Sequence, residues 1–351
     1  MLDRVLDRFL RWETVLLVLC VGVFAVGSAN SSEGAGFAGQ GNISFLLLDY
    51  SEVALLAFAL LPIVLTGEID LSVASTLGFC SALTGTLWDA GTGFETIVPI
   101  VILAGVALGS VNAVLVVRFG LPSLAVTIGT LGLYRGLAYV LLGDRAVTGF
   151  PENYRPLATD PIAGTFLPYA TVLVLFVGAA VAVLVHRTTT GRSLYAIGLG
   201  AQTARFSGIR VDRVKFALFM LSGGLAAVAS LIYTLRYNSA RADNASGMEL
   251  VAVAAVLLGG VSIFGGRGTV LGVATALLAM AGLRNVLFLD DVSNEIQNVI
   301  TGLLLILSVL VPVVFKPRRT KDAPLEPSDA DTERRAGADS GGELRRNHQG
   351  V

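Results

Sequence analysis

Apolar residues dominate this chain in long runs separated by short polar connections. About ten runs are long enough, at roughly 20 residues each, to cross the hydrocarbon core of a bilayer. They cover residues 14–29, 43–66, 69–88, 95–118, 121–142, 167–185, 214–236, 248–265, 269–289 and 295–315. Backbone amides in lipid need partners within the protein, and these runs lack the alternation of a β-barrel strand. The pattern therefore predicts an all-α, polytopic integral membrane protein of about ten transmembrane helices.

Composition supports this prediction and explains the glycines. Hydrophobic residues make up 54 % of the chain and charged residues only 15 %, which is more apolar surface than one soluble core could bury. We interpret most of the 40 glycines as sites where helices approach closely. Those within the spans include Gly105, Gly109, Gly129, Gly132, Gly223, Gly224 and Gly272. Cys20 and Cys80 lie far apart in apolar runs and are expected to be small buried hydrophobes, not a disulfide or a metal pair.

Basic residues outside the spans predict the orientation. They form three groups: Arg4, Arg8 and Arg11; Arg187, Arg192, Arg205, Arg210, Arg213 and Lys215; and Lys316, Arg318, Arg319 and Lys321. With ten spans all three groups fall on one side, so both termini are expected in the cytoplasm. Two places depart from this pattern. The turn at Glu68 has acids and no base on the inner side, and Arg236 and Arg241 lie on the outer side.

The chain divides by composition into three parts. We expect a cytoplasmic N-terminus at 1–11, a transmembrane domain at 12–315 and a disordered cytoplasmic tail at 316–351, where Pro, Gly and interspersed charges cannot bury a core. A cleaved signal peptide ending near 27–29 is the alternative at the N-terminus. Its removal would leave an odd number of spans and separate the basic groups.

Several enzyme classes lack their motifs here. None of the three lysines follows a glycine, so the chain has no Walker A loop for ATP. The glycines of LGGVSIFGGRGTVLG (258–272) fail the GxGxxG spacing, and Asp290-Asp291 lacks the second half of a DDxxD metal motif. His186, the only histidine near a span, is expected at its cytoplasmic end as an interfacial residue. We predict no catalytic residue, no metal site and no nucleic-acid partner.

Polar residues at membrane depth remain as candidates, because they are costly and mark either a pathway or a structural contact. They are Asp49, Glu52, Asn112, Arg135 and Asn298, of which the last four are our translocation-path candidates. Arg135 is a possible partner for one of the acids. For each residue, helix packing and solute contact both remain open.

The segment TGEIDLSVAS (66–75) places Glu68 and Asp70 between two apolar runs. It predicts a break between helices, with Asp70 and Ser72 placed to cap the helix that follows. The alternative is a gating role, in which the break flexes during transport. Glu68, Asp70 and Ser72 are therefore our helix-break or gating candidates.

The connection at 186–215 alternates arginines with small and apolar residues over a length sufficient for a short helix along the membrane face. It is either an ordinary basic loop or a docking surface for a soluble partner.

Four stretches carry a resemblance to a known family. They are TGEIDLSVAS (66–75), LPSLAVTIGTLGLYRGLAYVLLGDRAV (121–147), GRSLYAIGLGAQTARFSGIRV (191–211) and VLLGGVSIFGGRGTVLG (256–272). In this order and spacing the chain resembles the ribose-type, branched-chain-permease-like sugar permeases of bacterial ABC importers, over about residues 12–315. Glu68 and Ala74 stand where many members have glycine, and this variant looks most like the rhamnose branch.

The resemblance implies a multi-pass permease of the bacterial inner membrane that pairs with a second copy or a similar permease. It further implies a cytoplasmic ABC ATPase, which uses ATP and Mg, and an extracytoplasmic sugar-binding protein. The segment that engages the ATPase would contain Gly191, Arg192, Ser193, Gly198, Ala204, Gly208 and Ile209. Neither Glu68 nor Asp70 is expected to be a sugar ligand.

The expected function is import of a monosaccharide, rhamnose or a related sugar, by alternating access without chemistry or a cofactor in this chain. A secondary transporter of a small polar solute, driven by an ion gradient, is the alternative. A membrane-embedded glycolipid enzyme would need a carboxylate or metal constellation that the sequence does not show.

Overall fold

A computed structural model describes residues 12–29 and 36–314. The expected N-terminal segment 1–11 and tail 316–351 lie outside the described residues. The chain divides into two compact units, 1–309 and 310–351, and only 310–314 of the second are described. The elements are α2 (Trp12–Ala29), α3 (Gln40–Asp49), α4 (Ser51–Leu65), α5 (Val73–Asp89), α6 (Phe94–Ala113), the π-helix η1 (Val114–Arg118), α7 (Ser123–Leu142), β1 (Val147–Thr148), α8 (Pro156–Thr159), α9 (Tyr169–Arg187), α10 (Thr189–Leu199), α11 (Ala201–Phe206), α12 (Val211–Tyr237), β2 (Ser239–Ala240), α13 (Met248–Leu258), α14 (Val270–Leu289) and α15 (Asn294–Val314).

The helical membrane architecture predicted from the sequence is confirmed, and a helix occupies each of the ten expected segments. Within the described residues, five helices have the length and apolar composition of a complete span, and α3 with α4 makes a sixth if this pair, bent by 44°, is counted as one. The expected span at 248–265 is wrong in its extent. Its helix, α13, has only 11 residues, and a glycine-rich loop follows it.

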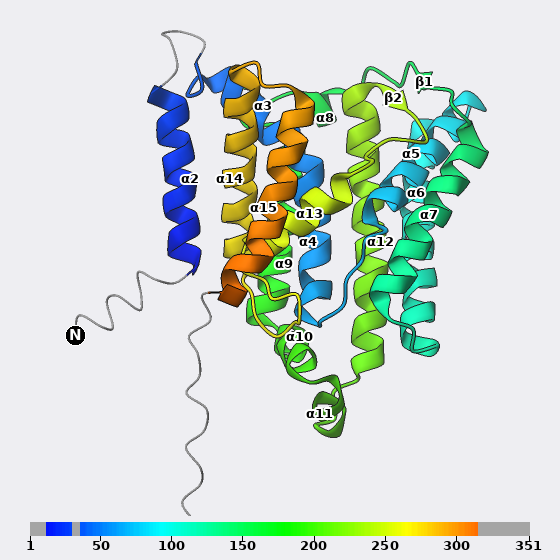
Figure 1. The fold of residues 1–351 in the computed structure, drawn as a ribbon. Helices are drawn as coiled ribbons and strands as arrows, with labels where there is room; N and C mark the ends of the chain where they lie inside the picture. Colours follow the sequence, from blue (N-terminus) through cyan, green and yellow to red (C-terminus); the bar gives the residue numbers. More distant parts are fainter. Residues whose placement is uncertain (1–11, 30–35, 315–351) are drawn as a thin grey trace, which may run out of the picture. The chain divides into compact units, whose positions relative to one another are not determined.

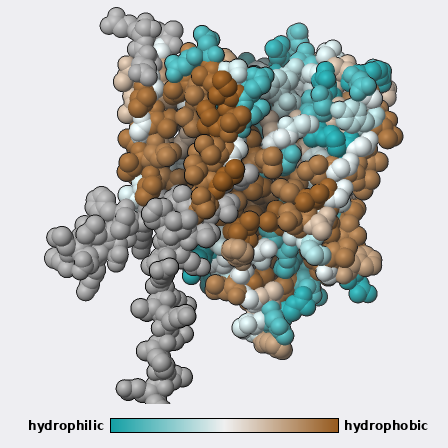
Figure 2. All heavy atoms as spheres, viewed as in Figure 1, coloured by the Kyte–Doolittle hydropathy of each residue, from teal (hydrophilic) through white to brown (hydrophobic). Residues whose placement is uncertain are grey.

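Two ends of the helical unit are distinguished by what they carry (Figure 1). We call the end with α10 and α11 the inner end, because it carries the basic connection expected in the cytoplasm. The opposite end, with α8 and the paired strands β1 and β2, is the outer end. Figure 2 shows an apolar band between the two ends, with hydrophilic residues gathered toward them. This distribution is that of a protein surrounded by lipid.

Helix α4 forms the centre of the packing, since every residue from Ser51 to Leu65 is buried. It packs against α9, α12, α13 and α14. Beside it, α12 and α6 approach closely through glycine. A Cβ at Gly109 would lie 2.2 Å from the Phe219 carbonyl oxygen, and one at Gly223 would lie 2.1 Å from the Gly105 carbonyl oxygen. These positions confirm the packing role expected of glycine.

Gly129 and Gly132 do not fit that expectation. A Cβ at either position would meet nothing within 4 Å in the described chain. Both lie on an exposed face of α7. Glycine in a span therefore does not by itself predict a contact within one chain.

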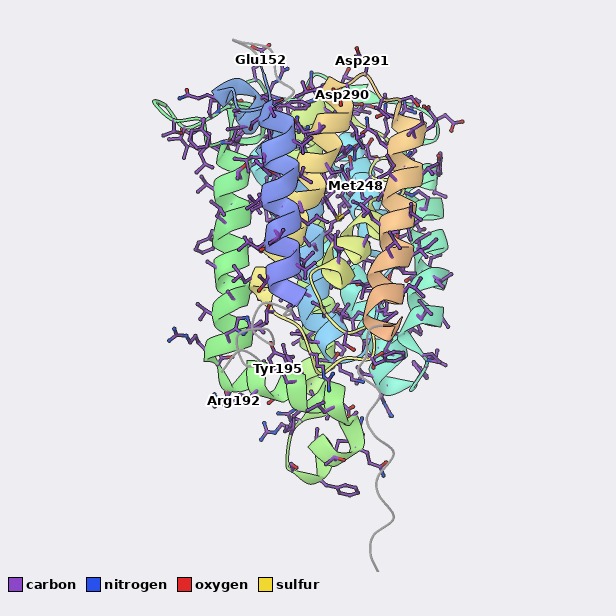
Figure 3. The ribbon with its side chains drawn as sticks, turned by 60° about the vertical axis from the view of Figure 1, so that its left-hand side comes forward. Glu152, Arg192, Tyr195, Met248, Asp290 and Asp291 are labelled. Carbon is purple, nitrogen blue, oxygen red and sulfur yellow. The ribbon has the colours of Figure 1, made fainter. Side chains whose placement is uncertain are left out.

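Two helices begin inside the bundle after a non-helical segment. Residues 66–72 lead into α5 after α4 ends, and residues 241–247 lead from β2 into α13. Figure 3 shows Met248, the first residue of α13, near mid-height between the ends. The polar residues predicted to break a helix at 66–72 do lie in such a break, and the second break was not predicted.

Candidate functional site

The carboxylate of Asp70 lies at the centre of a buried polar network. Asp70 is 2 % exposed. Its Oδ1 accepts hydrogen bonds from the amide and hydroxyl of Ser72, at 3.0 and 2.6 Å, and its Oδ2 accepts one from the Ser222 hydroxyl of α12 at 2.8 Å. These donors are all neutral. Asp70 therefore ties the first break to α12 through hydrogen bonds and not through an ion pair.

The network continues into α6 and α7. The Asn112 amide donates to the Ser72 hydroxyl at 2.8 Å. The Tyr134 hydroxyl lies 3.2 Å from the Asn112 Oδ1 and donates to the Leu108 carbonyl at 2.8 Å. Five side chains from four parts of the chain thus satisfy one another at membrane depth. Such networks fix a unique packing when every member is paired.

The contacts of Asp70 and Ser72 differ from the side-chain cap of α5 that the sequence predicts. Ser72 is the N-cap residue of α5, but its side chain forms no bond to that helix. Asp70 instead binds the Ser72 amide two residues ahead, as in an Asx turn. The backbone of the break also receives partners from α7: the Ser123 hydroxyl accepts from the Ile69 amide at 3.1 Å, and the Thr127 hydroxyl donates to the Ile69 carbonyl at 3.3 Å.

Glu68 pairs with Lys215, near the inner start of α12. Both side chains are largely buried, with 17 % and 16 % exposure. Lys215 and Ser222 are two helical turns apart and lie on the same face of α12. One face of α12 therefore contacts both acids of the first break. The turn at Glu68, which has no base nearby in the sequence, is paired with a base from a distant helix.

Arg135 of α7 holds the second break. Its guanidinium donates to the carbonyl oxygens of Ala242 and Asn244, both at 2.7 Å, and to that of Ala74 at 3.4 Å. Within the described residues it forms no ion pair, so the pairing considered for Arg135 with an acid is wrong. Carbonyl groups of an unwound segment need donors in lipid, and Arg135 supplies two bonds to this break and a third to Ala74 in the first turn of α5. Helix α7 thus contacts both breaks.

Arg236, in the last turn of α12, is the partner of the acids. It contacts Asp49 at 2.7 Å and Glu52 at 3.1 Å, and it donates to the Leu48 carbonyl at 3.1 Å. Glu52 is fully buried. This cluster spans the bend between α3 and α4. In the sequence, Arg236 stands out as a basic residue on the expected outer side, where the positive-inside rule predicts few basic residues.

The four translocation-path candidates do not meet in one site. Asn112 belongs to the Asp70 network, Arg135 to the second break, and Glu52 to the cluster around Arg236. Asn298, near the outer start of α15, is exposed. Their role in a path stays a prediction.

The predicted partner-docking segment forms α10 and α11 at the inner end. Thr188 caps α10 by accepting a hydrogen bond from the Gly191 amide at 3.2 Å. Gly191 is packed so closely on α9 that a Cβ would lie 2.0 Å from the Val185 carbonyl oxygen. Ala204 is buried with Ile197 and Val211 in a small separate core, against which Ile209 packs. The segment is a folded unit, not a loose basic loop.

Helix α10 touches the loops at the inner ends of both α4 and α13. A Cβ at Gly198 would lie 2.1 Å from the Leu65 carbonyl oxygen and 2.2 Å from the Gly266 amide nitrogen. Those two backbone groups are hydrogen-bonded to each other at 2.9 Å. The Tyr195 hydroxyl donates to the Gly268 carbonyl at 2.8 Å, and burial raises the pKa of Tyr195, so this hydroxyl keeps its proton. Figure 3 labels Tyr195 and Arg192 at this end.

The exposed surface around α10 and α11, at the inner end, carries apolar and basic residues. Three large apolar side chains are exposed here: Leu199 at the end of α10, Phe206 at the end of α11 and Phe264 in the loop after α13. Their exposures are 74 %, 85 % and 82 %. Arg192 is exposed and Ser193 is half-buried on α10, and Gly208, with φ +82°, turns the chain from α11 toward α12.

In the part of the chain that the structure covers, no three His, Cys, Asp or Glu side chains gather closely enough to hold a metal ion. Cys20 and Cys80 are free. The glycine-rich loop after α13 packs on α10, and His186 accepts a bond from the Val270 amide at 3.4 Å.

Comparison with known proteins places the chain in a family. The family model described as "branched-chain amino acid transport system / permease component" matches residues 42–309. The autoinducer 2 import system permease protein LsrD of Yersinia enterocolitica is 32 % identical over 311 residues, which cover 85 % of this chain and 91 % of that protein. The protein of the same name from Photorhabdus luminescens is 31 % identical over 309 residues, covering 85 % and 90 %. No solved structure matches the chain significantly. The chain therefore belongs to the family of permease components described for branched-chain amino acid transport systems, as a multi-pass protein of the bacterial inner membrane.

Proposed function

We propose that this chain is the permease subunit of an ATP-driven sugar importer. Its family consists of permease components, and its relatives include proteins named for autoinducer 2 import. The observation that carries the proposal is the position of α10, an inner-end helix in backbone contact with the loops that follow α4 and α13.

Helix α10 is placed to transmit movement. Gly198 sits against the hydrogen-bonded Leu65 and Gly266 backbones, and Tyr195 binds Gly268. A displacement of α10 therefore displaces the inner end of α4 and the loop between α13 and α14 together. Helix shifts of this kind at a subunit interface are a known route for conformational switching. Because the sequence has no phosphate-binding loop, a separate ATPase subunit would hold ATP and Mg and supply the movement.

We define the docking face as Leu199 and Phe206 with the neighbouring Arg192. Exposed apolar residues next to a basic residue suit a protein interface, where apolar side chains supply most of the affinity and charges orient the encounter. The ATPase would bind this face. An extracytoplasmic sugar-binding protein would deliver the solute at the outer end, and a second permease copy or a similar permease would complete the path.

Two solutes follow from different observations. The resemblance of TGEIDLSVAS favours L-rhamnose, and the names of the relatives favour autoinducer 2. The first experiment is uptake of each labelled solute by cells in which the gene has been deleted and then restored. Loss and recovery of uptake of one solute identifies it, and unchanged uptake of both directs the search to a panel of pentoses and hexoses.

The docking face is tested with Leu199→Ser and Phe206→Ser. Leu157→Ser on α8, which replaces a leucine that is 53 % exposed at the outer end, is the matched control. Loss of central interface contacts should lower uptake at least about tenfold while membrane abundance stays unchanged. The control should retain full uptake.

Energy dependence separates the importer from a secondary transporter. Uptake should stop when the partner ATPase gene is deleted and should continue after an ionophore collapses the ion gradients. The opposite pair of results would establish transport driven by an ion gradient and would overturn the proposal.

A further inference from the structure

A long apolar groove runs along the surface of the bundle between α9 and α14, with α4 beneath it and α3 at its outer end. Its volume is about 390 Å³. On α9 it extends from Thr171 to His186, which is about 22 Å at 1.5 Å per residue. Its walls include Phe58, Val174 and Leu278. This length is a large part of the roughly 30 Å hydrocarbon core.

A second space, of about 170 Å³, lies at the outer end between α3, α14 and α15. It differs in chemistry, because Asp49, Arg284, Asn294 and Gln297 line it together with aromatic rings. Leu46, Tyr50 and Ala281 line both spaces, so the polar pocket opens onto the outer end of the groove. A polar pocket joined to an apolar groove matches an amphiphilic molecule with its head at the outer end.

The charges in the pocket narrow the choice of head group. Asp49 contacts Arg236 through Oδ1 and keeps a side-chain exposure of 27 %. Arg284 also lines the pocket, and among the described residues it forms no ion pair with a carboxylate. The pocket therefore presents one cation without an acidic partner and one partly exposed carboxylate.

We propose that a phosphatidylethanolamine of the outer leaflet binds here, with its phosphate at Arg284, its ammonium group at Asp49 and one acyl chain in the groove. Guanidinium is a strong and directional partner for phosphate. A primary ammonium can donate hydrogen bonds to Asp49, which choline cannot. An anionic head group would meet repulsion from Asp49 and from Asp290 and Asp291, which lie at the same end in Figure 3.

The depth of Arg284 fits this arrangement. It lies five residues before the outer end of α14, or about 7.5 Å along the helix axis. A long arginine side chain can extend from that depth to the level of the head groups. The acyl chain of the same lipid would then point toward the inner end, along the groove.

The proposal is tested by native mass spectrometry of the purified full-length chain, in its transporter complex, after delipidation and addition of one defined lipid. Phosphatidylethanolamine should bind the unmodified protein at least about tenfold more tightly than it binds Arg284→Gln, because a charge-assisted bond is lost. Arg145→Gln is the control, since Arg145 is 68 % exposed at the outer end and lies 3.7 Å from Asp89. Equal retention by the two arginine variants would overturn the proposal, and so would equally tight binding of phosphatidylglycerol or phosphatidylcholine.

A second measurement needs no variant and so does not depend on folding of a mutant. Phosphatidylethanolamine with a photoreactive group in its acyl chain should crosslink mainly to groove residues of α9 and α14, such as Val174 and Leu278. Crosslinks spread evenly over the lipid-facing helices would overturn the proposal. Displacement of the lipid by free L-rhamnose at millimolar concentration would instead assign the polar pocket to a sugar and would also overturn it.

Discussion

At the residue scale, the buried carboxylates are stabilised in two different ways. Asp70 accepts only from neutral hydroxyl and amide donors, whereas Glu52 and Asp49 share Arg236. Removing a charge from water is costly, so either arrangement is stable only while its partners stay in place. The two sites should therefore respond differently when a partner is removed.

Loss of one neutral donor should have a moderate effect. Ser222→Ala removes the hydroxyl that bonds the buried Asp70 carboxylate, which should lower the free energy of unfolding by about 1.5–3 kcal/mol. Ser110→Ala is the control, because that hydroxyl bonds only the Val106 carbonyl of its own helix and should cost under about 0.5 kcal/mol. Thermal unfolding in detergent measures both. Equal stability of the two variants would show that the Ser222 bond contributes nothing.

Loss of the shared cation should have a larger effect, because it leaves acids unpaired. Arg236→Gln should cost about 3–5 kcal/mol, since Glu52 is fully buried. Adding Glu52→Gln should restore part of that loss, and the coupling energy should be about 0.5–3 kcal/mol. The two single variants and the double variant form the cycle, measured by unfolding in detergent. Simple additivity would contradict an energetic link between these residues.

The sequence identified the polar residues at membrane depth but not their partners. The free-energy cost of a polar side chain in lipid depends on its residue type and its position along a span. Asp49, Glu52, Asn112 and Arg135 could therefore be selected from the hydropathy pattern alone. Pairing depends on the rotation of helices that are distant in sequence. The outer-side position of Arg236 marked it as an exception to the charge pattern, but that position did not identify Glu52 as its partner.

At the element scale, contact between α6 and α12 depends on glycine backbones. Lipid gives no hydrophobic drive for helix association, so close packing and interhelical bonds hold the pair together. The same dependence on a missing side chain appears where α10 meets the inner loops. Each contact can be tested with an added methyl group.

Gly109→Ala should separate α6 from α12. Its Cβ would lie 2.2 Å from the Phe219 carbonyl oxygen, and overpacking of this kind costs about 1–3 kcal/mol. Gly129→Ala has open space, and alanine is the better helix former, so it should be neutral or stabilising. Detergent unfolding of the two variants gives the comparison. A stable Gly109→Ala protein would mean that the helices are farther apart than described.

Gly198→Ala should reduce transport by moving α10 off the inner loops. The new methyl group would meet the Leu65 and Gly266 backbones, which cannot move aside as a flexible side chain can. Gly200→Ala, two residues on, would meet only the Thr203 side chain at 3.4 Å and is the matched control. Uptake per unit of membrane protein should fall at least about tenfold in the first variant alone. Similar uptake in both would exclude this contact from coupling.

Helix positions along the chain followed well from hydrophobicity, because length and apolar content are local properties. The short α13 was missed for the same reason. Residues 248–265 are nearly as apolar as a span, but their helix ends at Leu258, and Gly259, Gly260, Gly265 and Gly266 follow in a loop that other elements cover. Burial of a loop by its neighbours is not visible in a hydropathy pattern.

At the scale of the whole molecule, two of the three exceptions to the charge pattern have a common explanation, whereas Arg241 forms an exposed ion pair with Asp243. Glu68 on the inner side pairs with Lys215, and Arg236 on the outer side pairs with Asp49 and Glu52. These charges are neutralised within the bundle. They therefore do not weigh against an orientation that rests on exposed loop charges.

Orientation is tested with single cysteines in a protein whose Cys20 and Cys80 are replaced by alanine. Arg118→Cys, exposed in the inner connection between α6 and α7, should react with a membrane-impermeant maleimide only after the membrane is opened. Glu152→Cys, exposed at the outer end in Figure 3, should react in intact cells. The reverse labelling pattern would invert the assignment of the two ends.

The attachment of α12 to both ends of α4 has a mechanical consequence. Lys215 holds Glu68 just beyond the inner end of α4, and Arg236 holds Glu52 in its first turn, about 32 Å away along α12. The two antiparallel helices are thus held together by a largely buried ion pair near each end, and separating them at either end would break one of these pairs. A movement of this pair as one body would therefore displace its outer and inner ends together. If a solute at the outer end and a partner at the inner end both favour the same position of this helix pair, each would raise the affinity of the other by the same free energy.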